Sequence, residues 1–336
     1  MRTIDFLEQG DGAITLIDQR LLPHEKKILT IKTHQELIEA IQTLAVRGAP
    51  ALGVAGALGV ALIALRSEQE KWSQEERDSA IAALRAARPT AVNLAWGVDQ
   101  VLPELVNGPS SVLNSALAIS RADGLANRAM GKLGAAYLLE KCGKKKLRIL
   151  THCNTGSLAT SDWGTALGVI RELSDQGYIE EVFADETRPL LQGSRLTAWE
   201  LSEAGINYRI LPDGAAASAL FSGLIDAVLI GADRIARNGD SANKIGSLGV
   251  AVAAKESGIP FLVVAPESTI DRSLASGDEI EIEFRADSEV THFAGKAVAP
   301  VGAKSYNPAF DVTLARYITA IVTEKCVYNL VAGDEL

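Results

Sequence analysis

The chain has 336 residues, of which 47% are hydrophobic and 22% charged, and its formal net charge is −9. This length suits two moderate domains or one large one, and the composition is that of a globular protein with a substantial core. The negative charge argues against broad binding to nucleic acid or to an anionic membrane, because those partners need a basic face. A local basic pocket for a small phosphate is compatible with it.

The cysteines and the N-terminus indicate a cytoplasmic protein. Cys142, Cys153 and Cys326 cannot all pair within one chain and lack zinc-ligand spacing, so we expect reduced thiols. Residues 1–19 lack the apolar core of a signal peptide. The longest apolar stretch, 49–65, is expected to be too short to span a bilayer comfortably.

Residues 1–140 are predicted to form a mainly helical domain after a short β start. The runs 14–17 and 27–31 are rich in Ile, Leu and Thr, which is typical of strands. Thr33 begins a capping-box pattern, and Pro50 occupies a favourable first-turn position. Further helices are expected at residues 74–86, 92–105 and 111–141. A lysine run at 144–146 marks the end of this part.

Beyond residue 140 the pattern changes to strands that alternate with helices. Strands are expected at residues 147–150, 182–184, 208–211, 227–230 and 261–264. Helices are expected at residues 164–176, 194–204, 215–222 and 246–257. This alternation predicts a parallel sheet with helices on both faces, without a dinucleotide-binding glycine motif. The fold class is therefore α/β: a smaller, mainly helical N-terminal domain and a Rossmann-like parallel-sheet domain over residues 141–336.

Polar residues follow each expected strand of the second domain. They are His152-Cys153-Asn154, Asp185-Glu186-Thr187-Arg188, Asp213, Asp233-Arg234 and Glu267-Ser268. Ligands of open parallel sheets bind beyond the carboxyl ends of the strands. Loops are polar in most proteins, but this regular placement favours a functional rim.

Two of these side chains are candidates for chemistry. Cys153 ends an apolar strand and precedes a glycine-containing loop, so it is either a buried small hydrophobe or a reactive thiol. Asp233 ends another apolar strand, and it either pairs with Arg234 or acts as an acid. His152, beside the thiol, is interpreted as structural.

Other segments are candidates for binding a phosphorylated sugar. Arg47 and Gly48 precede the helix that Pro50 opens, where free backbone N–H groups favour an anion. Arg88 lies at a second junction before a proline and is either a second phosphate ligand or a surface residue. Asn243-Lys244 stands before another helix start, and such side chains can bind hydroxyls and phosphate.

Taken together, these segments resemble methylthioribose-1-phosphate isomerases. The matching segments are Arg47-Gly48-Ala49-Pro50, Arg88-Pro89-Thr90-Ala91-Val92-Asn93, Thr151-His152-Cys153-Asn154-Thr155-Gly156, Glu186-Thr187-Arg188-Pro189, Gly231-Ala232-Asp233-Arg234, Asn238-Gly239-Asp240, Ala242-Asn243-Lys244 and Tyr306-Asn307-Pro308-Ala309-Phe310-Asp311-Val312-Thr313. The wider family includes regulatory subunits of translation initiation factor 2B and ribose 1,5-bisphosphate isomerases. The thiol and the acid together favour an isomerase.

The resemblance implies that Asp233 is the general acid and Cys153 the second catalytic group of an isomerase acting on 5-methylthioribose 1-phosphate. It implies substrate-binding roles for Arg47, Gly48, Ala49, Arg88, Gln192, Asn243 and Lys244. It also implies a homodimer with no metal and no organic cofactor. The alternatives are an isomerase of 5-deoxyribose 1-phosphate or ribose 1,5-bisphosphate, and a non-catalytic binding protein.

The chain also departs from the expected pattern. Ser157, Ser161 and Asp162 stand where the resemblance leads us to expect small apolar residues. Residues 212–217 differ from the usual segment although Asp213 is retained, and Cys326 replaces a usual glycine. The substituent at substrate C5 is therefore left open by the sequence.

Overall fold

The computed structural model describes residues 2–89, 91–143 and 146–336 and divides into two compact units. The helical unit contains Met1–Asn127 and Gly156–Gly164, and the sheet unit contains Arg128–Thr155 and Thr165–Leu336. The division falls inside one long helix, and the predicted boundary at 140/141 lies near the end of that helix. Thr90 of the Arg88 motif and Lys144 and Lys145 of the lysine run lie outside the described residues.

The helical unit begins with a small antiparallel sheet of β1 (Ile4–Leu7), β2 (Ala13–Ile17) and β3 (Ile28–Ile31). Its helices are α1 (His34–Gln42), α2 (Ala49–Gln69), α3 (Gln74–Arg85), α4 (Val92–Val101) and the first part of α5 (Pro109–Cys142). The capping box at Thr33 is confirmed, because its side chain and that of Glu36 each bind the other's backbone N–H. The α-helix expected over 92–105 ends at Val101, and the chain continues as a 3₁₀ turn over Leu102–Asn107.

Helix α2 is the core of the helical unit. It is long and apolar enough to cross a membrane by length and composition, but 83% of its most apolar window is buried inside the protein. The prediction that the apolar stretch 49–65 is too short to span a bilayer was therefore wrong about its length, because the helix runs on to Gln69. A helix that is apolar on all sides and buried by its own chain is typical of a protein core.

The main sheet of the sheet unit has the strand order β16-β15-β10-β7-β4-β5-β6. Its strands are β4 (Leu147–Thr151), β5 (Ile179–Asp185), β6 (Tyr208–Leu211), β7 (Ala227–Ile230), β10 (Phe261–Val264), β15 (Ala320–Val322) and β16 (Val327–Tyr328). All neighbouring pairs are parallel except β15 and β16. The predicted α/β class with a parallel sheet is confirmed, and the two C-terminal strands were not predicted.

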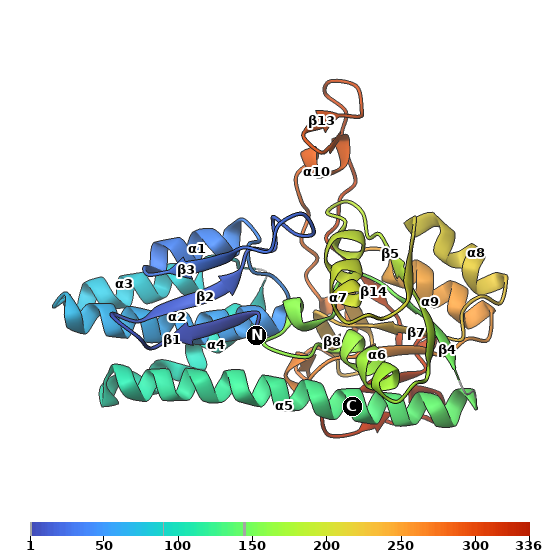
Figure 1. The fold of residues 1–336 in the computed structure, drawn as a ribbon, viewed down its shortest axis with the longest axis horizontal. Helices are drawn as coiled ribbons and strands as arrows, with labels where there is room; N and C mark the ends of the chain where they lie inside the picture. The colour runs from blue at the N-terminus through green and yellow to red at the C-terminus, as the bar shows by residue number, and fades with distance from the viewer. Residues whose placement is uncertain (1, 90, 144–145) are drawn as a thin grey trace. The chain divides into compact units, whose positions relative to one another are not determined.

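Helices cover both faces of this sheet (Figure 1). They are the last part of α5, α6 (Ala166–Asp175), α7 (Ala198–Glu203), α8 (Ala216–Phe221) and α9 (Ser247–Glu256). Along β4, Ile149 packs in one core with α5 and α6, whereas Leu150 packs in the other with α8 and α9. This alternation follows from the two-residue period of a strand.

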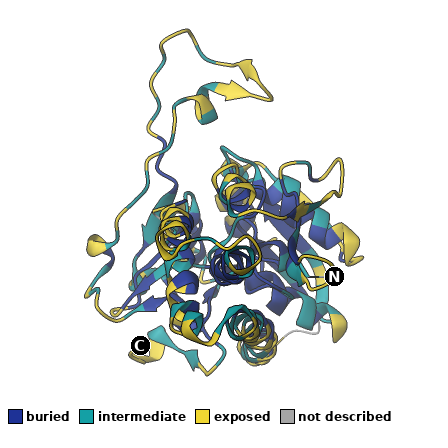
Figure 2. Ribbon diagram, turned by 90° about the vertical axis from the view of Figure 1, so that its left-hand side faces the viewer, coloured by how far each residue is buried: buried dark blue, intermediate teal, exposed yellow. Residues whose placement is uncertain are grey.

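Short elements extend from the carboxyl edge of the sheet. A second sheet, in the order β11-β8-β9-β14, contains β8 (Arg234–Ala236), β9 (Ser241–Lys244), β11 (Ile270–Asp271) and β14 (Phe310–Thr313). An arm carries α10 (Ser288–Thr291), β12 (His292–Phe293) and β13 (Lys296–Ala297) and is largely exposed (Figure 2). The remaining 3₁₀ or π turns are Leu102–Asn107, Ser157–Ala159, Gly193–Thr197, Asp213–Ala215, Glu267–Thr269, Gly277–Glu279, Ala315–Tyr317 and Leu330–Ala332.

Candidate active site

The strand order reverses between β4 and β7. From β4 the chain moves to β5 and β6 on one side, and from β7 to β10 and β15 on the other. Cys153 follows β4 and Asp233 follows β7, so both lie at this switch point, where open parallel sheets bind ligands. The two loops touch, because a Cβ added to Gly231 would come within 2.9 Å of Thr155 Cγ2.

Cys153 has an unusual backbone conformation. Its φ is 65°, in the left-handed region that residues other than glycine seldom adopt, and only 8% of the residue is exposed. Its N–H donates to Thr187 Oγ1 at 2.9 Å, and its carbonyl accepts from Thr197 Oγ1 at 2.6 Å. Such strain persists only where surrounding contacts enforce it, and it concentrates at functional sites.

Thr187 links Cys153 to the neighbouring strand ends. Its hydroxyl donates to the carbonyl of Asp185, which ends β5, at 3.0 Å. The Asp213 carboxylate, after β6, accepts from the N–H groups of Thr187 at 2.7 Å and Arg188 at 2.6 Å. Asp213 thus fixes the segment that holds the thiol in place. The sequence predicts both residues on the rim but not their roles, which depend on contacts between strands.

Asp233 is half-buried, and its N–H donates to the carbonyl of Ala242 at 2.9 Å. The sequence left open a pairing of Asp233 with Arg234. In the structure the Arg234 guanidinium forms an ion pair with Asp271. Hydrogen bonds from Ser273 and the charge of Arg234 hold the pKa of Asp271 below its usual range despite partial burial.

Gln192 is buried, with 4% of its surface exposed. Within the described part of the chain, its Oε1 accepts no hydrogen bond. Gly193 brings this segment against β5, because an added Cβ would lie 1.6 Å from the Asp185 carbonyl oxygen. A buried acceptor without a partner is uncommon in proteins and fits a donor on a ligand, such as a sugar hydroxyl.

Asn243 and Lys244 lie at the end of β9. Asn243 Nδ2 donates to Ser247 Oγ at 2.9 Å. Lys244 Nζ donates to the Ala309 carbonyl at 2.7 Å and lies 4.6 Å from the centre of the Phe310 ring. Ala309 and Phe310, which provide the contacts of Lys244, belong to the C-terminal segment that matches the resemblance. The sequence assigned no role to that segment.

Asp311, on β14, caps the start of helix α9. Its carboxylate accepts from the N–H groups of Gly246 at 2.8 Å and Leu248 at 3.2 Å, at the start of α9. Burial raises the pKa of Asp311, and the two backbone hydrogen bonds oppose that rise. An acid directly after an Asn-Pro-Ala-Phe sequence gave no signal for this long-range cap.

Glu267, after β10, binds other partners than the predicted site residues. Its carboxylate accepts from Arg272 Nη2 at 3.1 Å and from the Tyr328 hydroxyl at 3.0 Å. Burial opposes ionisation, but these hydrogen bonds outweigh it and lower the pKa of Glu267. This member of the predicted rim is therefore explained by local structure.

In the helical unit, Arg47, Gly48 and Ala49 form the entry to α2, as predicted. Gly48 has φ of 95°, and an added Cβ would lie 2.4 Å from the carbonyl oxygen of Ala159. Only glycine fits there, which explains the Arg-Gly-Ala-Pro sequence. Arg88 is half-buried between α3 and α4, and its carbonyl accepts from the Ala91 N–H at 3.0 Å.

The loop 156–164, which follows the thiol segment in sequence, belongs to the helical unit and is anchored there. Asp123 accepts from the Ser161 N–H at 2.8 Å and from its hydroxyl at 2.6 Å. Gln19 Nε2 donates to the Leu158 carbonyl at 2.7 Å. Burial raises the pKa of Asp123, and the Ser161 hydrogen bonds oppose the rise. The serine at 161, a departure from the expected pattern, is thus explained by its partner.

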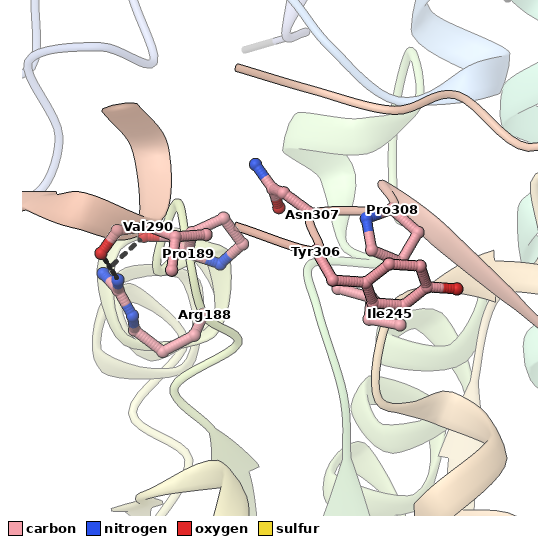
Figure 3. A pocket seen from close by; sticks show the side chains of 7 residues that line it. All are labelled: Arg188, Pro189, Ile245, Val290, Tyr306, Asn307 and Pro308. Atoms are coloured by element: carbon pink, nitrogen blue, oxygen red, sulfur yellow. Dashed lines mark hydrogen bonds between the residues drawn. The ribbon is translucent and has the colours of Figure 1, made fainter. Parts of the chain in front are cut away.

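A pocket of 170 Å³ opens at the base of the arm (Figure 3). It is lined by Arg188, Pro189, Ile245, Val290, Tyr306, Asn307 and Pro308. Two of these residues neighbour predicted or positioning residues in sequence: Arg188 follows Thr187, and Ile245 follows Lys244. The pocket therefore lies beside the rim of the sheet, although its lining includes none of the residues to which the resemblance assigns a catalytic or substrate-binding role.

Comparison with known proteins places the chain in a family. Residues 45–329 match the model of the initiation factor 2 subunit family. The chain belongs to this family.

Curated relatives in the initiation factor 2 subunit family include sugar-phosphate isomerases. The chain is 46% identical to the methylthioribose-1-phosphate isomerase of Acetivibrio thermocellus, over 95% of each protein. It is 47% identical to the 5-deoxyribose 1-phosphate isomerase of Moorella thermoacetica, over 94% of this chain and 92% of that one. A probable bifunctional methylthioribose-1-phosphate isomerase/methylthioribulose-1-phosphate dehydratase of Nocardia farcinica is 52% identical, and the match spans 99% of this chain but 61% of that relative.

Solved structures of the family share the fold. The 5-methylthioribose 1-phosphate isomerase of Pyrococcus horikoshii has a TM-score of 0.89 at 41% identity, covering 98% of this chain and 92% of that one. A protein from A. fulgidus described as subunit delta of translation initiation factor eIF-2B has a TM-score of 0.84 at 40% identity, covering 98% and 96%. The resemblance inferred from the motifs is confirmed.

Proposed function

We propose that this protein is an aldose–ketose isomerase that converts 5-methylthioribose 1-phosphate to 5-methylthioribulose 1-phosphate, a step of methionine salvage. One observation carries the proposal. Cys153, in a strained left-handed conformation, follows β4 at the switch point, and the adjacent strand β7 leads to Asp233. The relatives named as isomerases of this substrate, at 41% to 46% identity over nearly the whole chain, support the substrate class.

The reaction needs an acid first. The substrate is a glycosyl phosphate, so its ring must open before C2 can become a ketone. In the proposed mechanism Asp233 protonates the ring oxygen and the bond from that oxygen to C1 breaks. Hydrogen then moves from C2 to C1, the C2 hydroxyl loses its proton, and the carbonyl forms at C2 while C1 keeps its phosphate.

Cys153 acts in the hydrogen transfer. Either its sulfur takes the C2 hydrogen as a proton that exchanges with water before C1 is protonated, or the buried side chain shapes the path of a direct hydride shift. Substrate carrying deuterium at C2 separates the two routes. Retention of the label at C1 indicates the hydride shift, and its loss to water indicates the proton relay.

Binding is assigned to the other predicted residues. Gln192 offers a buried acceptor, and Arg47, Gly48 and Ala49 lie at the N-terminus of a long helix, where anions are favoured. We also assign substrate contacts to Arg88, Asn243 and Lys244 on the strength of the resemblance. On the same basis we propose that the protein is a cytoplasmic homodimer.

The first test is turnover. Purified protein is incubated with 5-methylthioribose 1-phosphate, and ketose formation is followed by NMR for the wild type, Cys153→Ala and Asp233→Asn. We expect both substitutions to lower kcat by at least about 10²-fold, the usual contribution of a positioned acid or base. Cys326→Ala, which removes an exposed thiol, is the matched control and should keep full activity.

The outcomes separate the alternatives. If the wild type is inactive on this substrate but active on 5-deoxyribose 1-phosphate, the Moorella relative names the reaction instead. If the folded wild type binds sugar phosphates without turnover, the protein is a regulatory binding protein. If the two variants keep full activity, the residue assignment is wrong even though the reaction is right.

A further inference from the structure

His152 is fully enclosed, with 1% of the residue exposed, and both of its ring nitrogens face oxygen atoms. Nδ1 lies 2.9 Å from Asp185 Oδ2, and Nε2 lies 2.8 Å from the carbonyl oxygen of Ile245. A carbonyl oxygen only accepts, so Nε2 must carry a hydrogen. A second proton must lie between Nδ1 and the carboxylate, because two lone pairs cannot face each other at that distance.

The surroundings favour the doubly protonated ring. Burial opposes the charge, but the hydrogen bond and charge of Asp185 outweigh it and raise the pKa of His152 to about 9. The other titratable groups that act on this pair are also acidic. Cys153 is the next residue in the chain and acts on the ring, as does Asp311 from β14. Asp213 and Glu186 act on Asp185.

Three of these side chains also form a group that could hold a metal ion, and the same hydrogen bonds account for that group. His152, Asp185 and Asp213 place possible ligand atoms within 4.8 Å of one another. Both ring nitrogens of His152 are engaged, however, and the two oxygens of Asp213 hold backbone N–H groups. These nitrogen and oxygen atoms bind other groups of the protein rather than a metal ion.

The ring of His152 packs beneath the loop that follows Asn243 and Lys244. Its Nε2–H holds the carbonyl of Ile245, the next residue in the chain. Gly246 has φ of 107°, and a Cβ there would lie 2.8 Å from His152 Cε1, so the loop rests directly on the ring. The Ile245 side chain, in turn, lines the pocket at the base of the arm (Figure 3).

The thiol does not depend on this contact. The backbone of Cys153 is held on both sides by the hydroxyls of Thr187 and Thr197. Loss of the His152 ring would therefore loosen the loop after β9 by removing the anchor of the Ile245 carbonyl, although Asp311 and Ala309 still bind backbone N–H groups there. The thiol segment keeps its own anchors.

We propose that His152 is a positioning residue for substrate binding: its doubly protonated ring ties the end of β4 to the Ile245 carbonyl and so fixes Asn243 and Lys244. The proposal rests on the proposed function for its kinetic consequence. It goes beyond the structural role that the sequence indicated, because it states which loop the ring holds and which kinetic constant depends on it.

Two substitutions separate the two hydrogen bonds of the ring. In His152→Gln the side-chain amide can reach the position of Nε2 and keep the Ile245 contact, and in His152→Asn it can reach only the position of Nδ1. We expect His152→Asn to raise KM about tenfold, the worth of one buried hydrogen bond, with little change in kcat. His152→Gln should keep KM close to that of the wild type.

Asp185→Asn removes the charge but leaves the ring able to donate from Nε2, so its KM should also stay near the wild-type value. Equal rises in KM for His152→Asn and His152→Gln would overturn the proposal, as would a loss confined to kcat. Thermal unfolding of each variant identifies any that fails to fold, and the remaining variants then decide.

A substrate-free measurement keeps this inference separate from the proposed function. Amide hydrogen exchange at Ile245 and Gly246 should be faster in His152→Asn than in the wild type and unchanged in His152→Gln. NMR of the wild type at pH 7 should show two protonated ring nitrogens on His152. If the wild type turns over no sugar phosphate, the proposed function fails but these two results still test the loop contact. Unchanged exchange in both variants, or a ring that carries no proton on Nε2, would overturn it.

Discussion

At the scale of single residues, the carboxyl edge of the sheet is organised by buried and half-buried polar groups that bind backbone. Thr187 and Thr197 hold Cys153, Asp213 holds Thr187, and Asp311 holds the start of α9. A buried polar group without a partner is costly, so each such contact restricts its loop to one conformation. The positive φ of Cys153 is maintained in this way.

The His152–Asp185 pair makes a pH-dependent contribution to stability. The folded-state pKa of His152 is about 9, above the ordinary 6.5, so folding favours the protonated ring. Its contribution is therefore complete below about pH 6.5 and is lost as the pH rises through about 9.

We expect urea unfolding to show a large stability difference between the wild type and His152→Gln at pH 7. The difference should shrink by pH 10, where the wild-type ring has lost its second proton. A difference that stays constant across this range would show that the ring is neutral in the folded protein at pH 7.

At the scale of elements, glycines allow close packing between helices of the helical unit. Helices α2 and α4 approach so closely that a Cβ on Gly97 would lie 1.9 Å from the Gly53 carbonyl oxygen. On the α2 side, a Cβ on Gly56 would lie 2.5 Å from the Leu94 carbonyl oxygen. The many small residues of the sequence thus have a specific use, which composition alone indicated only in general terms.

Gly97→Ala should lower the free energy of unfolding by about 1–3 kcal/mol or more, because two helix backbones must move apart. Gly249→Ala is the matched control. Gly249 also lies in a helix, but among the described residues no atom outside its own stretch of helix lies within 4 Å of a Cβ placed there. This control should be neutral or more stable by about 0.5–1 kcal/mol. Chemical denaturation of both variants measures the difference, and equal effects would contradict the close packing.

At the scale of the whole molecule, the proposed homodimer is directly measurable. Sedimentation equilibrium should give twice the chain mass of 35.6 kDa. A mass of 35.6 kDa at micromolar concentration would remove the homodimer from the proposal without affecting the proposed reaction. Turnover by the wild type and the Cys153 and Asp233 variants is assessed independently of that result.

The sequence by itself determined the α/β class, five parallel strands of the main sheet and the family. Apolar runs of three or four residues separated by helical patterns identify buried parallel strands, because both faces of such strands are covered. Helix ends differ from the predicted ones by a few residues, as expected where the last turn becomes 3₁₀. From the sequence, the switch-point rule also predicts that Cys153 and Asp233 lie on one rim.

Only the tertiary structure decided which polar residues act on which. The contacts of His152 with Ile245, of Cys153 with Thr197 and of Gly48 with Ala159 join residues far apart in sequence. Hydropathy and periodicity report whether a side chain faces a core, but they carry no information about its partner across a sheet or between two loops. The short strands β8, β9 and β14 escaped prediction for the same reason. Their pairing, rather than any apolar pattern, makes them strands.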